Sequence, residues 1–508
     1  MRYTKINDWI SEFYFYIVKI YNSKLSRKLR IYNNPIIFTP YHWIRDIIRK
    51  HESKKLRKLD ERGLLTPDVL RSLTYQNLLN LKLYSLEIFK DIATKISEIN
   101  LSTIQKKEKI NVAFYVPLHS LWSCDRLYHL FEEDKRFEPK IIVPKQFLGT
   151  KITNEERYQE TVNYFKNNGY RTIGVGDTEY RRKKWHDIGN PDIIILLTPY
   201  SDYLPKTFDI QHIPLSSLSL YIPYGLSSVG NYEVYDTPGA QLCWKYLAED
   251  LLSKKVISEH SELSGFNVLV TGHPKMDLLI KPEMEYDAKY LWKIHPDYQI
   301  QIVKKIIYAP HHSIFNEAIK YSTFHLNYRE IYEFAKMHPE TSWIVKPHQN
   351  LKQASVLNGL FQSEEDYEKY MDLWDALPNA RTVRSGTYDD LFLTSDAMIM
   401  DCGSFLAEYT TTNKPLIFLR RPEQELNEWG EKLLEGVYSV DGKDITGIYE
   451  TITNVIINGN DYLAEKRNRL VNDMVNIYNQ FEGVDTASEF IYQYLKNEIE
   501  KPNNTPIE

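Results

Sequence analysis

Short runs of apolar, mostly β-branched residues recur along the chain from residue 110 onward, and longer stretches with helical character separate them. This alternation is typical of parallel strands joined by crossover helices. The runs form two series on either side of a polar, charged stretch. The first series comprises 111–116, 140–143, 192–197, 218–222 and 267–271, and the second comprises 305–309, 342–346, 396–400 and 415–419. We therefore expect an α/β protein with two Rossmann-like domains.

The same pattern predicts the organisation of the whole chain. The expected segments are a basic helical arm at 1–106, a first Rossmann-like domain at 107–285, a second at 286–480, a helix at 481–500 that crosses back to the first domain, and a frayed tail at 501–508. In open parallel sheets, ligands bind outside the carboxyl ends of the strands. We therefore look for functional residues in the loops that follow the apolar runs.

The arm differs from the rest of the chain in charge. Residues 1–60 contain 14 lysines and arginines but five acidic residues, although the chain as a whole has a net charge of −5. Basic residues interleaved with Trp9, Phe13 and Trp43 favour contact with an anionic membrane surface. Helices packed on the body with a solvated basic face explain the pattern equally well. Nucleic acid is not expected as a partner, because the body is acidic and no nucleic-acid-binding motif accompanies the arm.

Composition narrows the class of protein. The 508 residues are 43% hydrophobic and 26% charged, which indicates a folded protein of two or three domains. The three cysteines are far apart, with no CxxC and no histidine at zinc-ligand spacing, so neither disulfides nor structural zinc are expected. The N-terminus has neither a signal-peptide pattern nor about 18 uncharged apolar residues in a row. We expect a cytoplasmic protein, peripheral at the inner face of the cell membrane.

Two loops of the second domain contain neighbouring cationic or titratable side chains. His311 and His312 follow the first apolar run of that domain, and Lys346 and His348 follow the second. A histidine at a strand end can donate to a phosphate oxygen or transfer a proton near neutral pH, and a lysine supplies positive charge. The alternatives are histidines that serve only packing and a surface Lys-Pro turn.

The loop after the run at 396–400 is the most informative. Asp401, Gly403 and Ser404 precede a predicted helix, whose backbone N–H groups and dipole suit a phosphate. Glu408 lies one turn along this helix, where it can accept hydrogen bonds from ribose hydroxyls. An ordinary helix N-cap has the same sequence pattern. Its position directly after a buried strand favours ligand binding.

Three residues of the first domain are expected to face the second-domain loops across the cleft between the two domains. His119, Tyr224 and His273 each follow an apolar run, and a packed, structural role is the alternative for both histidines. Walker A, GxGxxG, HExxH and GxSxG motifs are absent, which argues against P-loop NTPases, dinucleotide oxidoreductases, zincins and serine hydrolases. A metal-binding DxD motif is also absent, so no metal is expected.

These loops, in this order, resemble the CDP-glycerol glycerophosphotransferase family of teichoic-acid and capsule polymerases. The matching stretches are 271–277, 308–310, 346–348, 395–409 and 414–418, with a closing segment at 481–489. The resemblance implies a GT-B fold, in which two Rossmann-like domains face a cleft and the second domain holds the donor. It also implies transfer of glycerol phosphate from CDP-glycerol to a hydroxyl, with release of CMP and without a cofactor.

The resemblance also implies roles for individual residues. His348 matches the family's essential histidine after Lys-Pro, and Asp401, Ser404 and Glu408 match the donor-binding turn and helix. We expect His348 and Asp401 at the reacting centre. A helix N-terminus together with lysine and histidine side chains can neutralise the charge of the leaving CMP without a metal.

The chain departs from the family at two informative places. The family usually has Thr and Arg where His311 and His312 stand, and a His-Gly pair where Tyr224 begins the corresponding dipeptide. The histidine of that pair is a candidate base in the family. Either Tyr224 therefore has a different task, or His119 or His273 supplies the base, or the donor is not CDP-glycerol.

Three functional hypotheses follow. The leading one is a membrane-associated transferase that adds glycerol phosphate or a related polyol phosphate to a lipid-linked surface polymer. The second keeps the fold but uses a nucleotide sugar, and the released nucleotide distinguishes it from the first. The third is a non-catalytic scaffold of a capsule-assembly complex.

Overall fold

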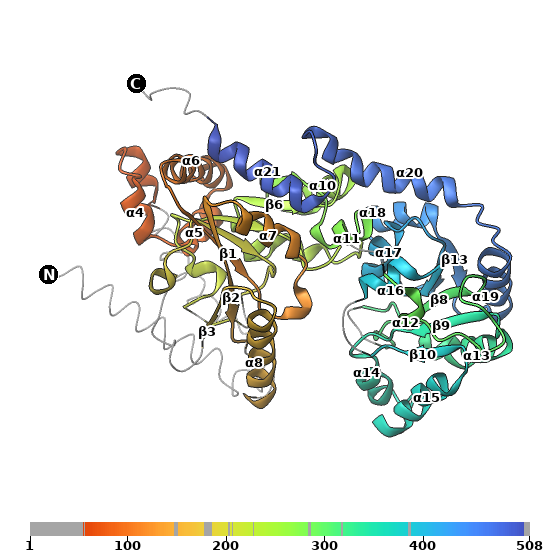
Figure 1. Cartoon of the computed structure of the whole chain (residues 1–508). Coiled ribbons are helices and arrows are strands. Elements are labelled where there is room, and N and C mark those ends of the chain that lie inside the picture. Colours follow the sequence, from red (N-terminus) through yellow and green to blue (C-terminus); the bar gives the residue numbers. More distant parts are fainter. Residues whose placement is uncertain are drawn as a thin grey trace, which may run out of the picture.

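The computed structural model contains two α/β domains side by side, with the first described helices on the first domain (Figure 1). Helix α21 runs along the first domain and helix α20 along the second. It describes residues 54, 56–146, 151–176, 185–201, 204–205, 207–226, 228–282, 286–315, 319–384 and 388–501. The aromatic residues of the predicted membrane-contacting arm, including Trp9 and Trp43, lie outside the described residues, as does the end of the predicted tail.

The first domain is built on a seven-stranded sheet in which all neighbouring strands are parallel. Its strands are β1 (Ile110–Tyr115), β2 (Phe137–Pro144), β3 (Thr172–Val175), β4 (Ile193–Leu196), β5 (Leu218–Tyr221), β6 (Lys245–Ala248) and β7 (Val268–Val270), in the order β3-β2-β1-β4-β5-β6-β7. The five predicted runs are confirmed as β1, β2, β4, β5 and β7. The apolar pattern misses β3, a partly exposed edge strand, and β6, which begins with a lysine.

The second domain has a six-stranded sheet, which is again entirely parallel. Its strands are β8 (Lys304–Ala309), β9 (Thr341–Val345), β10 (Ala380–Thr382), β11 (Ala397–Met400), β12 (Leu416–Arg420) and β13 (Tyr438–Asp441), in the order β10-β9-β8-β11-β12-β13. All four predicted runs are confirmed as the central strands. The two edge strands, β10 and β13, carry polar residues and give no such signal.

Helices cover both faces of the first sheet. They are α4 (Pro67–Ser72), α5 (Tyr75–Tyr84), α6 (Leu86–Gln105), α7 (Asp125–Glu133), α8 (Lys151–Asn167), α9 (Pro238–Leu242), α10 (Leu251–His260), α11 (Asp277–Ile280) and α21 (Ala487–Glu500). One face packs against α4, α5 and α6, and the other packs against α7, α8 and α21. Among the described helices, none is both long and apolar enough to span a membrane.

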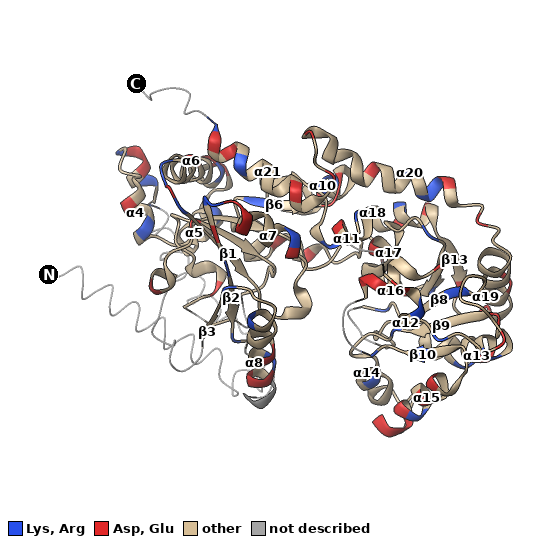
Figure 2. Ribbon diagram, in the orientation of Figure 1, with Lys and Arg blue, Asp and Glu red and all other residues tan. Residues whose placement is uncertain are grey.

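Part of the predicted arm belongs to this first domain. Leu70, Leu81 and Ile92 of helices α4–α6 share a buried cluster with Tyr115 of β1. Both signs of charge lie on these helices, and Asp68 and Arg71 of α4 form an ion pair (Figure 2). For residues 67–105, packing on the body therefore describes the helices, whereas the strongly basic part of the arm precedes them.

Helix α21 lies on the first domain although it follows the second domain in sequence. Its residues Ile491, Leu495 and Ile499 join the cluster that contains Phe131 of α7. The carboxylate of Asp277 accepts hydrogen bonds from the first two backbone N–H groups of α21, at 2.9 and 3.0 Å. These contacts fasten α21 to the first domain.

The second sheet is also covered on both faces. Its helices are α12 (Ala288–Leu291), α13 (Phe324–Met337), α14 (Leu351–Leu357), α15 (Glu364–Ala376), α16 (Asp389–Thr394), α17 (Gly403–Thr410), α18 (Glu428–Leu433), α19 (Ile445–Thr451) and α20 (Ala464–Val475). Helices α13, α15 and α19 pack on one face, and α16, α17 and α18 pack on the other.

The loop after β5 connects the first domain directly to the second. Val229 forms an isolated antiparallel bridge with Leu426. The hydroxyl of Ser228 donates to the carbonyl of Gly403 at 2.6 Å, and the indole N–H of Trp429 donates to Asp250 at 2.6 Å. Protein contacts therefore join the loops at the carboxyl ends of the two sheets.

Candidate functional site

The second sheet changes its direction of strand addition at β8. Strands β9 and β10 extend to one side of β8, and β11, β12 and β13 extend to the other. Open α/β sheets bind ligands at such a switch point. Because β9, β8 and β11 are consecutive neighbours, the loops after them meet at one place. These loops carry His311, His312, Lys346, His348 and Asp401.

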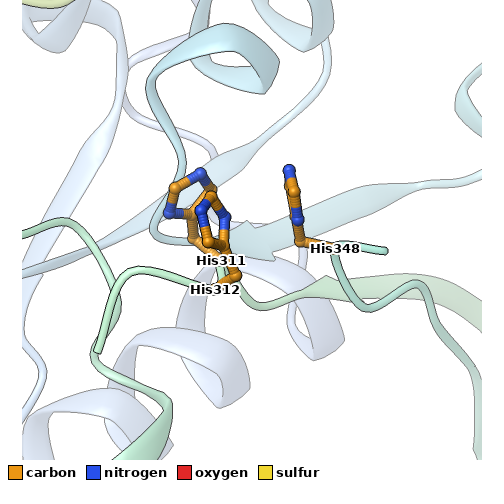
Figure 3. A group of neighbouring side chains, drawn as sticks. All are labelled: His311, His312 and His348. Carbon is orange, nitrogen blue, oxygen red and sulfur yellow. The ribbon is translucent and has the colours of Figure 1, made fainter. Parts of the chain in front are cut away.

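Three imidazoles meet at this switch point (Figure 3). The rings of His312 and His348 are stacked with centroids 4.1 Å apart, and His311 lies 4.3 Å from His312 and 5.0 Å from His348. The backbone N–H of His348 donates to the carbonyl of Pro310 at 3.1 Å, which ties the two loops together. Burial lowers the pKa of all three imidazoles, to about 4 for His348. The neighbouring imidazoles oppose protonation of His311 and His348 and lower their pKa further, and Lys346 adds to this effect at His348. The rings are therefore neutral at pH 7.

The ring nitrogens of this trio differ in their partners. The Nδ1 of His311 lies 2.8 Å from the Ser313 hydroxyl, and the Nδ1 of His348 accepts from the backbone N–H of Asn350 at 3.1 Å. The Nδ1 of His312 is buried and has no hydrogen-bond partner among the described residues. A buried polar atom without a partner is costly, so this nitrogen is a natural contact for a ligand.

Asp401 lies beneath the histidine loop. Its side chain is 1% exposed, and its carboxylate accepts from the backbone N–H groups of His311 at 2.6 Å and Thr323 at 2.5 Å, and from the Thr323 hydroxyl at 3.0 Å. Burial raises the pKa of Asp401 to about 6. The structure therefore does not support the expected direct contact of Asp401 with the reacting centre. We assign it a positioning role for the His311 loop.

Helix α17 begins directly after β11, as the sequence predicts. A Cβ on Gly403 would lie 2.5 Å from Val229, so glycine is required where the first-domain loop passes over the helix. The Ser404 hydroxyl lies 3.2 Å from the Cys402 thiol, and no side chain caps the helix. The first N–H groups of α17 thus keep the uncapped form that suits a phosphate.

Glu408 is already occupied by protein groups. It is 1% exposed, its Oε1 lies 3.0 Å from the Nζ of Lys275, and its Oε2 accepts from the Tyr388 hydroxyl at 2.7 Å. Because Lys275 follows β7, this ion pair joins the first domain to the second. The predicted ribose contact of Glu408 therefore competes with the ion pair. The Nζ atoms of Lys275 and Lys346 each lie 5.8 Å from the centre of the Tyr388 ring.

Sequence reasoning does not single out Lys275 or Tyr388. Lys275 does lie within the family-like stretch at 271–277, which is the signal that could have identified it. Tyr388 gives no signal, because its relevance arises only when α16 packs beside α17. Burial lowers the pKa of Lys346, the predicted cation of this region.

His273 has no ring nitrogen left for catalysis. Its Nε2 donates to the carbonyl of Pro223 at 2.7 Å, and its Nδ1 accepts from the backbone N–H of Lys275 at 3.1 Å. The residue is 1% exposed, and burial lowers its pKa to about 4. The structure therefore contradicts a role for His273 as the general base. It fastens the loop after β7 to the loop after β5.

The other first-domain candidates are not part of the histidine cluster. The ring of His119 stacks on Tyr164 of α8 with centroids 5.0 Å apart, and its Nδ1 lies 3.4 Å from the Thr161 hydroxyl. Tyr224 is 41% exposed in the loop after β5. The structure thus brings together the predicted residues of the second domain, but not those of the first.

Comparison with known families identifies this region. Residues 243–439 match the family described as CDP-glycerol:poly(glycerophosphate) glycerophosphotransferase. This stretch is similar to that family. The match includes every second-domain residue described above, and it confirms the resemblance on which the expectation of a transferase enzyme rests. A search of curated proteins gave no significant match.

Solved structures share the architecture of this chain. A putative UDP-N-acetylglucosamine 2-epimerase from Listeria monocytogenes matches at 13% identity with a TM-score of 0.50, over 78% of this chain and 99% of its own. It confirms the expected GT-B arrangement of two Rossmann-like domains. The wall teichoic acid polymerase TagF matches at 14% identity and a TM-score of 0.46, over 82% of this chain and 96% of its own.

Proposed function

We propose that the protein transfers glycerol phosphate, or a related polyol phosphate, from a CDP-activated donor to a hydroxyl of a growing teichoic-acid-like or capsular polymer. The family match over residues 243–439 carries this proposal, because it spans the loops that meet at the switch point of the second sheet. The acceptor hydroxyl gives its proton to a general base, and its oxygen attacks the phosphorus that bears the polyol. The bond from that phosphorus to the bridging oxygen breaks, and CMP leaves with the electron pair.

The geometry supports this chemistry through charge. The uncapped N-terminus of α17 and the ammonium group of Lys346 lie at the same strand ends, where a diphosphate is attracted by both. His348 stands beside them, and its family counterpart is essential for transfer. Phosphoryl transfer needs mainly positioning and neutralisation of charge, which such fixed groups supply without rearrangement.

Nucleotide release tests this proposal. The purified full-length protein is supplied with CDP-glycerol, CDP-ribitol or common nucleotide sugars, together with a membrane extract as the source of acceptor. We expect CMP to appear from a CDP-polyol. Release of a nucleoside diphosphate from a sugar donor would replace the polyol phosphate by a sugar, and the absence of release with every donor would contradict an enzymatic function.

We further propose that the acceptor is lipid-linked and that residues 1–60 bring the enzyme to an anionic membrane surface. The excess of basic residues in this segment supports the proposal. A truncation should end at residue 50, because Leu56 is buried in the core of the first domain and Asp60 pairs with Lys95 at 3.0 Å. The truncated protein is expected to lose binding to anionic vesicles at low salt. Unchanged binding would exclude this role of the arm.

A further inference from the structure

The histidine cluster at the switch point has the composition of a metal site. Each of His311, His312 and His348 offers one ring nitrogen, and these three nitrogens lie within 4.8 Å of one another. Within the described part of the chain, this is the single group of three or more histidine, cysteine or acidic side chains that meets this condition. Zinc binds imidazole nitrogens at about 2.0–2.1 Å, so rotations of the side chains, including a turn of the His348 ring, are needed to bring the three nitrogens into range.

Hydrogen bonding in the cluster favours a ligand with an empty orbital. The buried Nδ1 of His312 has no partner in the described structure, and a metal ion accepts the lone pair that this nitrogen carries in one neutral tautomer. A metal-bound histidine usually donates its other N–H to a neighbouring oxygen. The Ser313 hydroxyl lies 2.8 Å from the Nδ1 of His311, and its oxygen also accepts from the backbone N–H of Tyr321 at 2.9 Å. Its second lone pair can accept such a bond once the 3.3 Å contact from the Ser313 backbone N–H to the same Nδ1 is given up.

His348 must exchange one contact to complete the site. Its Nδ1 accepts from the backbone N–H of Asn350 at 3.1 Å, so the neutral ring carries its proton on Nε2 in the arrangement observed. A half-turn of the ring releases this contact and presents a lone pair to the ion. This exposed turn follows β9, and its backbone N–H can bond to water instead.

We propose that His311, His312 and His348 bind one divalent transition-metal ion of the zinc type, and that its open coordination position takes a phosphate oxygen. Three neutral nitrogen ligands favour zinc or cobalt over magnesium and calcium, which prefer oxygen ligands. The metal site stands on geometry alone, whereas the phosphate contact rests on the proposed function. The proposal replaces the sequence-based expectation of a site without metal.

Titration of the metal alone tests the site. Full-length protein without an affinity tag is stripped with a chelator, then titrated with cobalt while visible absorption is recorded, and with zinc in competition with a chromophoric chelator. We expect one ion per chain and a cobalt spectrum typical of tetrahedral coordination. The variants His312→Ala and His348→Ala are expected to weaken binding by at least about 10-fold.

His325→Ala is the matched control. His325 is also a partly buried histidine of the second domain with an unpartnered Nδ1, but its ring lies against Phe315 at 5.0 Å, outside the cluster. This variant is expected to bind cobalt and zinc like the unchanged protein. Stoichiometric binding that persists in both cluster variants, or no binding by the folded wild-type protein, would overturn the metal site.

A nucleotide titration tests the phosphate contact separately. Binding of CDP and CMP to the stripped protein is measured with zinc, with magnesium and without metal. We expect zinc to strengthen binding of CDP by about 10-fold or more in the wild-type protein but not in His312→Ala. Zinc binding without any effect on CDP would overturn the phosphate contact and leave the metal site intact. Failure of the transferase assay with normal zinc binding would instead remove the proposed function.

Discussion

The two domains have similar sheets but use the carboxyl ends of those sheets differently. In the second domain the loops after β8, β9 and β11 meet and bring His311, His312 and His348 into contact. In the first domain the corresponding histidines serve the fold: His273 has both ring nitrogens bonded, and His119 packs on α8. Under the proposed function, the second domain holds the reacting groups, and the first domain supplies contacts such as the Lys275–Glu408 ion pair.

Substitution of His348 should lower activity more than the other changes considered below. His348→Ala is expected to lower kcat by about 10²–10⁴-fold, as for removal of a group that acts on the reacting phosphate. The side chain is partly exposed, so the melting temperature should change little. Steady-state CMP release and a thermal melt measure both quantities. A folded, fully active variant would remove His348 from the site.

Loss of the Asp401 carboxylate should instead affect stability first. Asp401→Ala leaves two backbone N–H groups and a hydroxyl without their acceptor, which should lower the free energy of unfolding by about 2–4 kcal/mol. Thermal and chemical denaturation measure this loss. A melting temperature equal to that of the unchanged protein, together with lost activity, would restore Asp401 to the reacting centre.

The ion pair between Lys275 and Glu408 tests the coupling of the domains. Lys275→Met leaves the buried Glu408 carboxylate with the Tyr388 hydroxyl as its remaining hydrogen-bond partner among the described residues. It should lower kcat/KM by about 10-fold, equivalent to about 1.4 kcal/mol. The double variant Lys275→Met/Glu408→Gln should recover part of the stability, because the unpaired charge is gone. Additive losses in the double variant would show that the two side chains act independently.

The smallest effect on activity is expected at His273. His273→Ala removes the hydrogen bonds to Pro223 and Lys275 and should lower the free energy of unfolding by about 1–3 kcal/mol. Activity per folded molecule should fall by less than about 3-fold, because neither ring nitrogen faces a substrate. A loss of kcat as large as that of His348→Ala would instead support His273 as the general base.

Much of the fold was predictable because central parallel strands are apolar on both faces. The sequence therefore indicates eight central strands and the edge strand β7. It misses the edge strands β3, β10 and β13 and the central strand β6, which begins with a lysine. The loops that form the site were predictable, because ligands bind at the carboxyl ends of parallel strands and the sequence locates those ends.

The partners of the site residues were not predictable. The N–H groups that occupy Asp401 come from a loop and a helix start whose approach depends on the folded second domain. The contact between Lys275 and Glu408 depends on how the two domains face each other. Such contacts arise from tertiary packing, which no local pattern encodes.

Transfer of glycerol phosphate as one unit is tested most directly by following both halves of the transferred group. CDP-glycerol labelled in the glycerol and, separately, in the phosphorus attached to it is incubated with the full-length protein and a membrane acceptor. We expect both labels to enter the polymer in equal amounts, with one CMP released for each glycerol phosphate unit added. Glycerol label without phosphorus in the polymer, or release of CDP, would contradict phosphoryl-linked transfer.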